Sequence, residues 1–348
     1  MKAAVCRQYG PPEVVQIEEV PTPEPSDDEV LVRVTASTVN SGDARLRALR
    51  VPRGLKTLIR LRMGWRKPKN TIAGLDAAGQ VEAVGANVTR FQPGDRVVAS
   101  RGFVGGCHAE QITVGQDGTI TTIPAGLSDQ DAVALLFGGA TAIDFLRRGK
   151  LADGESILIN GASGAVGVAA VQLAKNRGAQ VTAVCSGANA DLVRSLGADH
   201  VIDYTTDDPT AGDERYDVVM DCHGTLPYRR SKGLLKPGGR FLMVIGNMPQ
   251  MIAMLWQKAT LGGTAPFDTD DFAALMALAA KGSLKPVIDQ VLPLEQIVEA
   301  YRRVDSDHKV GSLVLAVGTN ASGDEEPSGD EQASGDEEAP GDEEAPGD

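Results

Sequence analysis

The sequence is poor in aromatic residues and cysteine, and it has no long apolar run. Phe, Trp and Tyr make up 4% of its 348 residues, so a large core must be mostly aliphatic. The four cysteines, at positions 6, 107, 185 and 222, are too few and too scattered for a disulfide framework. No run of about 18 apolar residues could span a membrane, and the first residues do not resemble a signal peptide. We therefore expect a cytoplasmic protein with reduced thiols.

The acidic residues are unevenly distributed along the chain. The formal net charge is −13, but twelve of the 47 Asp and Glu residues lie in 321–348, where there is no Lys or Arg. The other 35 acids nearly balance 34 bases, so the remaining chain is almost neutral. This excludes a globally basic protein, and we do not expect a nucleic-acid partner. The acidic end repeats units such as SGDEEP without apolar periodicity, which predicts a disordered tail over 319–348.

A second charged segment is basic. Ten Lys and Arg residues and no acid occur between Arg45 and Lys69, interleaved with Leu, Ile, Met and Trp65. The pattern is compatible with a solvated loop, and also with an amphipathic lip that touches anionic lipid or nucleotide phosphates. The acidic tail could fold back on these bases or act only as a solubilising segment.

The hydrophobic periodicity divides the chain into two kinds of structure. Residues 1–124 contain short strand patterns separated by Gly and Pro turns, which favours a barrel-like β-domain. From residue 125 onward, strands alternate with helices, among them strands over 156–160, 180–185 and 200–203 and a helix over 227–235, which predicts a parallel sheet covered on both faces. Two later strands, 287–292 and 312–317, flank a helix and could rejoin the first domain.

One strand–turn–helix unit carries a phosphate-binding pattern. The apolar strand 156–160 is followed by three glycines spaced G-x-x-G-x-x-G and then by an apolar helix. The first glycine would permit a tight turn, the second would let the backbone approach a pyrophosphate, and the third would allow close helix packing. A glycine-rich loop without a ligand is the alternative. The predicted phosphate site, at the positive end of the helix, consists of Gly161, Ser163, Gly164, Ala165, Val166 and Gly167.

The end of the next strand, 180–185, indicates which coenzyme is bound. An Asp or Glu there would hold a free ribose 2′-hydroxyl and favour NADH. The sequence instead has Ser186-Gly187-Ala188-Asn189, whose small neutral groups leave room for a 2′-phosphate. We therefore expect NADPH rather than NADH, with Ser186 and Asn189 at the site. The same two side chains could alternatively cap the following helix.

Several motifs follow one another in a fixed order along residues 1–318. They are Gly74-Leu75-Asp76-Ala77-Ala78-Gly79, Phe91-Gln92-Pro93-Gly94-Asp95-Arg96-Val97, the glycine turn, Leu196-Gly197-Ala198-Asp199 and Leu235-Lys236-Pro237-Gly238-Gly239-Arg240. In this order they resemble the zinc-independent medium-chain dehydrogenases/reductases, near the quinone oxidoreductases. The resemblance implies an α/β protein in which a doubly wound Rossmann sheet joins a GroES-like, β-rich catalytic domain.

The same resemblance implies the division of the chain. The GroES-like catalytic domain would comprise 1–124 and 286–318, and the Rossmann domain 125–285, with the coenzyme in the cleft between them. The acidic tail, 319–348, would follow. A homodimer is also implied.

The positions that hold zinc in related enzymes have other residues here. Zinc members carry Gly-His-Glu where this chain has Gly74-Leu75-Asp76, and their first catalytic cysteine falls in a segment without Cys here. Cys107-His108 and Cys222-His223 are adjacent pairs, and on a strand each pair would offer one ligand to a given site. Structural zinc needs four ligands, so we expect no zinc and no other metal site.

Without a Lewis acid, hydride transfer to an already polarised acceptor is favoured, and we expect a small-molecule quinone or α,β-unsaturated carbonyl as substrate. Asn40 and Asp43 match the family's cleft-facing Asn-x-x-Asp pattern. The resemblance implies that Asn40 bonds the nicotinamide or the substrate oxygen and that Asp43 orients it. Turn formation is their alternative role. Arg45 stands where some relatives have a proton-donating Tyr, so water or a coenzyme ribose hydroxyl could supply the proton.

Three further residues are assigned to the coenzyme. Thr141 resembles the residue that meets the nicotinamide, and Tyr204 matches a position that reaches the adenosine phosphate. Ile245 ends a predicted strand, and the carboxyl ends of parallel strands line the ligand crevice. Thr141 could instead be a helix-interior residue, and Tyr204 an aromatic cover of the sheet.

Two other functions are compatible with this sequence. One is an NAD(P)-dependent alcohol dehydrogenase or carbonyl reductase of the same fold, for which no proton donor is evident. The other is a nucleotide-binding interaction protein with little turnover, because binding and chemistry are separable on one fold.

Overall fold

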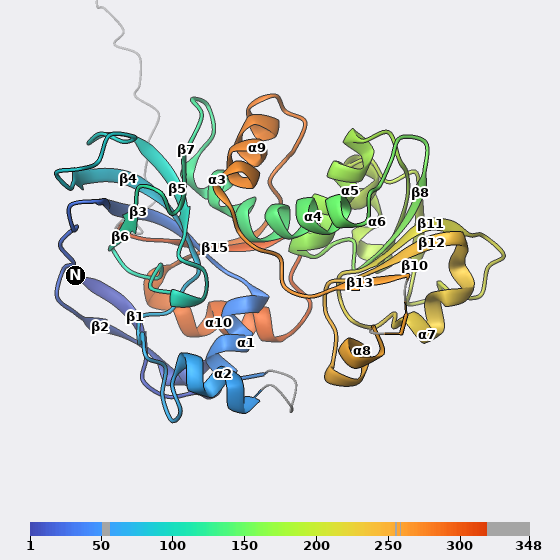
Figure 1. Ribbon diagram of the computed structural model, residues 1–348, viewed down its shortest axis with the longest axis horizontal. Helices are drawn as coiled ribbons and strands as arrows, with labels where there is room; N and C mark the ends of the chain where they lie inside the picture. Colours follow the sequence, from blue (N-terminus) through green and yellow to red (C-terminus); the bar gives the residue numbers. More distant parts are fainter. Residues whose placement is uncertain (51–55, 255, 258, 319–348) are drawn as a thin grey trace, which may run out of the picture.

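The computed structural model of the protein describes residues 1–50, 56–254, 256–257 and 259–318, and Figure 1 shows its two main sheets side by side. The predicted acidic tail and residues 51–55 of the basic segment lie outside the described residues. Within the described part of the chain, no helix is long and apolar enough to cross a membrane.

One sheet has six strands, all parallel, in the order β10-β9-β8-β11-β12-β13. This is the 3-2-1-4-5-6 order of the doubly wound dinucleotide-binding fold, so the predicted Rossmann sheet is confirmed. Strands β8, β9 and β10 have the predicted bounds; buried apolar runs of five or six residues mark β8 and β9, whereas β10 is a four-residue strand that is not buried. The strands are β8 (Ser156–Asn160), β9 (Gln180–Cys185), β10 (His200–Asp203), β11 (Tyr216–Asp221), β12 (Leu235–Met243) and β13 (Thr260–Gly262).

The second sheet belongs to the predicted GroES-like domain. Its order is β14-β15-β3-β4-β5-β7, with β6 paired to β3. The late strand β15 pairs antiparallel with the early strand β3, with Leu313 opposite Val39, so the C-terminal segment returns to this sheet. The strands are β3 (Glu29–Val39), β4 (Asp76–Val84), β5 (Arg96–Ser100), β6 (Gln111–Gly115), β7 (Thr119–Thr122), β14 (Ile288–Pro293) and β15 (Ser312–Ala316), beside a hairpin of β1 (Lys2–Cys6) and β2 (Val15–Glu19).

The helices differ from expectation mainly in the basic segment, where the periodicity did not predict α1 and α2. The predicted helix 227–235 is shorter, because α7 has four residues. On the Rossmann side α4 and α5 are in close contact: a Cβ on Gly138 would lie 2.1 Å from the carbonyl oxygen of Ala165. The helices are α1 (Ser41–Ala48), α2 (Lys56–Met63), α3 (Asp129–Ala134), α4 (Leu136–Arg148), α5 (Ala165–Asn176), α6 (Ala190–Ser195), α7 (Tyr228–Ser231), α8 (Met248–Ala253), α9 (Thr269–Ala280) and α10 (Ile297–Asp305).

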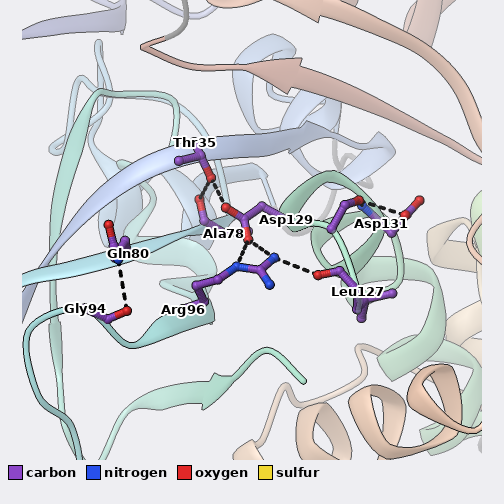
Figure 2. Close-up of polar contacts among 9 residues, drawn as sticks. Thr35, Ala78, Gln80, Gly94, Arg96, Leu127, Asp129 and Asp131 are labelled. Carbon is purple, nitrogen blue, oxygen red and sulfur yellow. Dashed lines mark hydrogen bonds and ion pairs between the residues drawn. The ribbon is translucent and has the colours of Figure 1, made fainter. Parts of the chain in front are cut away.

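A polar network fixes the start of α3 to the GroES-like sheet (Figure 2). The guanidinium of Arg96, on β5, donates to the Asp129 carboxylate at 2.9 Å and to the Leu127 carbonyl at 2.7 Å. The hydroxyl of Thr35, on β3, donates to the same carboxylate at 2.6 Å. Because Asp129 begins α3, these bonds hold that helix against the sheet.

Candidate active site

The turn between β8 and α5 is shaped by its glycines. Gly161 has a φ of +76°, in the left-handed region that disfavours residues with side chains. A Cβ on Gly167 would lie 2.2 Å from the carbonyl oxygen of Gly161, so a side chain there would push α5 away from the turn. Gly164 differs, because the nearest contact of its Cβ would be the Gly161 oxygen at 3.6 Å. Two glycines therefore shape the turn, and the third leaves open space at the helix N-terminus.

This helix end has the properties of an anion site. In the described structure no side chain caps α5, whose N-cap is Gly164, so the first amides of this twelve-residue helix have no side-chain acceptor. The carbonyl oxygen of Ser163 accepts a hydrogen bond from the Gly311 amide at 2.8 Å. The turn is thereby tied to the segment that precedes β15, and the open helix end lies where the two domains meet.

The other predicted coenzyme residues follow neighbouring strands of the same sheet. Ser186 and Asn189 lie after β9, where the side-chain Nδ2 of Asn189 donates to the Ser186 hydroxyl at 3.2 Å. Neither side chain caps a helix, so the capping alternative is not realised. Tyr204, after β10, is 54% exposed. Ile245, after β12, lies beside Gly224, where an added Cβ would be 3.2 Å from Ile245 Cγ2. These residues share the carboxyl edge of the sheet with the glycine turn.

The sequence analysis missed a carboxylate at this edge. Asp203 ends β10, and the parallel register places it opposite Cys185, at the end of β9. A Cβ on Gly187 would lie 2.4 Å from Asp203 Oδ2, so the carboxylate lies directly against the Ser186–Asn189 turn. Hydrogen bonds from the Thr205 hydroxyl and amide lower the pKa of Asp203, which is therefore charged at neutral pH. The signal that would have revealed it is the pairing of β9 with β10.

On the catalytic side, Asn40 and Asp43 begin α1. The Asn40 Oδ1 accepts from the amides of Gly42 at 2.8 Å and Asp43 at 3.0 Å, and the Asp43 carboxylate accepts from the Asn40 amide at 2.9 Å. This reciprocal capping box satisfies donors at the helix end. The predicted turn-forming role of the pair is therefore realised as a helix cap. Asn40 Nδ2 donates one hydrogen bond, to Asp76 Oδ2 at 3.5 Å, which leaves its second N–H.

Buried ionisable groups surround this pair. Burial raises the pKa of Asp76 to about 7, and burial raises the pKa of Asp43 well above its usual value. His108 is fully buried and its Nε2 lies 2.9 Å from the Thr38 carbonyl oxygen, while burial lowers its pKa to about 4. We therefore describe His108 as a neutral ring that donates to Thr38. The region favours uncharged forms of its side chains at neutral pH.

A cavity of about 290 Å³ opens beside Asp43. Its walls are largely apolar and include Leu75, Met63, Phe103, Val104 and Tyr301. All its described lining residues belong to the catalytic side of the molecule. The volume suits a small organic ligand.

The cavity wall and the coenzyme side meet at Gly42. A Cβ there would lie 3.1 Å from both Leu75 Cδ1 and Phe137 Cε2. Phe137 is on α4, one turn before Thr141, whose hydroxyl donates to the Phe137 carbonyl at 2.7 Å. The Thr141 hydroxyl is thus bonded within its helix, as the helix-interior alternative predicts. Asn40, Leu75 and α4 nevertheless form one continuous boundary between the domains.

The positions expected to hold zinc in related proteins are apolar or dispersed here. Leu75 is 5% exposed and lines the cavity. Cys107 and His108 are both buried in an irregular segment, not on a strand as the sequence analysis assumed. His223 is exposed. Across the described residues, no group of three His, Cys, Asp or Glu side chains is placed to hold a metal ion.

Comparison with known proteins places these features in a family. Residues 26–141 match the alcohol dehydrogenase GroES-like domain, and residues 196–315 match a family described as zinc-binding dehydrogenase. A chloroplastic quinone oxidoreductase of Triphysaria versicolor is 32% identical over 85% of this chain and 92% of its own. The chain belongs to the medium-chain dehydrogenase/reductase superfamily, among its quinone oxidoreductase-like members. It is therefore an oxidoreductase.

Two further relatives agree with this assignment. An NADPH-dependent alkenal/one oxidoreductase of Arabidopsis thaliana is 29% identical over 90% of this chain and 79% of its own. A quinone oxidoreductase structure from Coxiella burnetii has a TM-score of 0.82 and 28% identity, and the match covers 91% of this chain and 99% of that one. The medium-chain dehydrogenase/reductase fold therefore extends over nearly the whole described chain.

Proposed function

We propose that the protein is a zinc-independent, NADPH-dependent reductase of quinones or α,β-unsaturated carbonyls. The observation that carries the proposal is the open, uncapped helix end at Gly164, which the Ser163–Gly311 hydrogen bond ties to the segment before β15. The GroES-like domain would be 1–124 with 286–318, and the Rossmann domain 125–285. We also propose a homodimer in the cytoplasm, for which sedimentation and fractionation are the tests.

The fit of a dinucleotide rests on the space that Gly164 keeps open. Gly161, Ser163, Ala165, Val166 and Gly167 would hold the pyrophosphate through backbone amides. Ser186, Asn189 and Tyr204 would face the adenosine end, and Thr141 and Ile245 the nicotinamide end. A bound nicotinamide coenzyme supplies the hydride.

The catalytic domain would position the acceptor. Asn40 Nδ2 is the donor that the capping box leaves available, and we assign it to the substrate oxygen or the nicotinamide amide. Asp43 would keep Asn40 in place through the capping box. The apolar cavity wall at Leu75 excludes water from the reacting atoms and offers no metal ligand. Leu75 thus supports the zinc-independent assignment, although the matched family model is named for zinc.

The coenzyme preference depends on opposing features. Ser186 and Asn189 leave room for a 2′-phosphate, which supports NADPH. The charged Asp203 beside them would repel the 2′-phosphate of NADPH, and its carboxylate could accept a hydrogen bond from the ribose 2′-hydroxyl of NADH. We therefore expect NADPH to be used with a preference that Asp203 limits.

The test is NADPH and NADH oxidation by metal-chelated enzyme against a 1,4-quinone, an enone and an aldehyde. We expect turnover of quinone or enone that survives chelation. Loss of activity on chelation, restored by zinc, would contradict the zinc-free reaction. Turnover of the aldehyde alone would favour a carbonyl reductase. Tight NADPH binding without turnover of any acceptor would favour an interaction protein.

A further inference from the structure

Four large apolar side chains are exposed in two segments that line the cavity: Phe103 and Val104 line it themselves, and Leu61 and Trp65 lie two positions either side of the lining residue Met63. Leu61 is 64% exposed, Trp65 55%, and Phe103 and Val104 61% each. The two segments that carry them are joined, because Asn70 Nδ2 donates to the Val104 carbonyl at 2.8 Å. Met63, Phe103 and Val104 also line the same cavity. We call Leu61, Trp65, Phe103 and Val104 the mouth patch; α2, which carries Leu61, lies at the lower edge of Figure 1.

The chain around the mouth patch is strongly basic. Lys56, Arg66 and Lys67 are exposed, and no acidic residue occurs between positions 44 and 75. The ion pairs that the described structure shows within this stretch are those of Arg47 and Arg50 with Asp305, so Lys56, Arg66 and Lys67 have no acidic partner among the described residues. An apolar surface bordered by exposed cations is therefore presented at the cavity mouth.

We propose that the mouth patch docks on an anionic lipid surface. Leu, Phe and Trp side chains would enter the interface between headgroups and acyl chains, and the surrounding Lys and Arg would contact anionic headgroups. A second copy of the chain fits less well, because two equally basic patches repel each other. The acidic tail could match the charge, but residues 319–348 are Ala, Asn, Asp, Gln, Glu, Gly, Pro, Ser and Thr, so they offer no large apolar side chain to cover the patch. RNA would leave Leu61 and Val104 uncovered, since stacking needs aromatic rings.

Docking in this orientation would place the cavity mouth at the lipid surface. A lipid-soluble acceptor could then enter the cavity without crossing water. This consequence rests on the proposed reductase function, whereas docking itself does not.

The first test is sedimentation of the full-length protein with vesicles of phosphatidylcholine alone or mixed with phosphatidylglycerol. We expect binding to the anionic vesicles only, and release at high salt. The double variant Lys56→Gln with Lys67→Gln should weaken binding several-fold. The matched control, Lys232→Gln with Lys281→Gln, removes two exposed charges from the Rossmann domain and should bind as the unmodified protein does. Equal weakening by both double variants, or equal binding to both kinds of vesicle, would overturn the proposal.

Tryptophan fluorescence tests the apolar contact directly. Trp65 and Trp256 are the two tryptophans, so Trp256→Phe leaves Trp65 as the single reporter. Its emission should shift to the blue and resist acrylamide quenching when anionic vesicles are added. An unchanged spectrum would overturn the proposal. If Trp65 were protected from acrylamide without vesicles, another occupant would cover the patch and the proposal would fail. That occupant would be the tail if the protection does not depend on protein concentration, and a second copy of the chain if it does. Tighter binding of RNA than of vesicles would also overturn it.

These readouts are separate from turnover. Reduction of a water-soluble quinone without vesicles should be the same in both double variants and in the unmodified protein. If the turnover is present and the vesicle binding absent, docking fails alone. If the reverse holds, the reductase function fails alone.

Discussion

Replacing Gly164 by Ala should separate coenzyme binding from folding. The φ of −77° and ψ of 170° at this residue are accessible to Ala, and the new methyl group would meet nothing closer than the Gly161 oxygen at 3.6 Å. The loss of a glycine N-cap and the lower entropy of the unfolded chain oppose each other, each contributing about 0.5–1 kcal/mol. We therefore expect the free energy of unfolding to change by less than about 1 kcal/mol.

Coenzyme affinity should fall much more. A phosphate oxygen bonded to the first amides of α5 lies about 3 Å from nitrogen, whereas a methyl carbon needs about 3.5 Å or more from any neighbour. The pyrophosphate would have to move away, losing about one charge-assisted hydrogen bond, which corresponds to roughly a 10- to 100-fold rise in Kd. Isothermal titration with NADPH and thermal unfolding measure the two effects.

Two glycine variants serve as controls for this prediction. Gly167→Ala places a Cβ 2.2 Å from the backbone oxygen of Gly161, so it should lower both stability and affinity. Gly233→Ala meets nothing within 4 Å, lies outside the turn and should change neither. If Gly164→Ala kept both its Tm and its NADPH affinity, no phosphate would lie over this helix end and the assigned site would be wrong.

Three further predictions concern single side chains. Asn40→Ser keeps a capping hydroxyl but removes Nδ2, so kcat should fall at least about tenfold with little change in Tm; an unchanged kcat would leave Asn40 only a capping role. Asp203→Asn removes the charge beside Gly187, so the KM for NADPH should fall about tenfold while that for NADH does not fall; equal changes in both would contradict the repulsion. Burial raises the pKa of Asp76 to about 7, so the fold favours the protonated carboxyl. The stability that this protonated form provides is fully present below about pH 4 and is lost as the pH rises through 7. Asp76→Asn should therefore stabilise the fold by on the order of 3 kcal/mol above pH 7 and by less at pH 5, as measured by denaturant unfolding.

The Rossmann half was predictable from sequence because its signals are local. Strands β8 and β9 are short apolar runs between turn residues, β10 is a shorter Val-Ile pair bounded by polar residues, and the predicted bounds of all three agree with the structure. The catalytic half was less predictable. Strands β6 and β7 have only five and four residues, and α1 begins in a segment so rich in Arg and Lys that its apolar face is hard to recognise. The Asn40-x-x-Asp43 spacing was nevertheless a helix-start signal, which the sequence analysis interpreted as a turn or a functional pair.

The site was harder to predict than the fold because its decisive features depend on distances between separate strands. No local pattern connects Asp203 with Ser186. The parallel register nevertheless places the Asp203 carboxylate beside the Ser186–Asn189 turn, whose lack of acidic residues had favoured NADPH. Burial likewise changes what a residue can do: Asp43 and Asp76 are read as charges in the sequence, but desolvation raises the pKa of both. The capping box then occupies Asn40 Oδ1 and leaves only Nδ2 for a ligand. A residue type at the right spacing therefore identifies a candidate, and its remaining hydrogen-bonding capacity decides which role it can have.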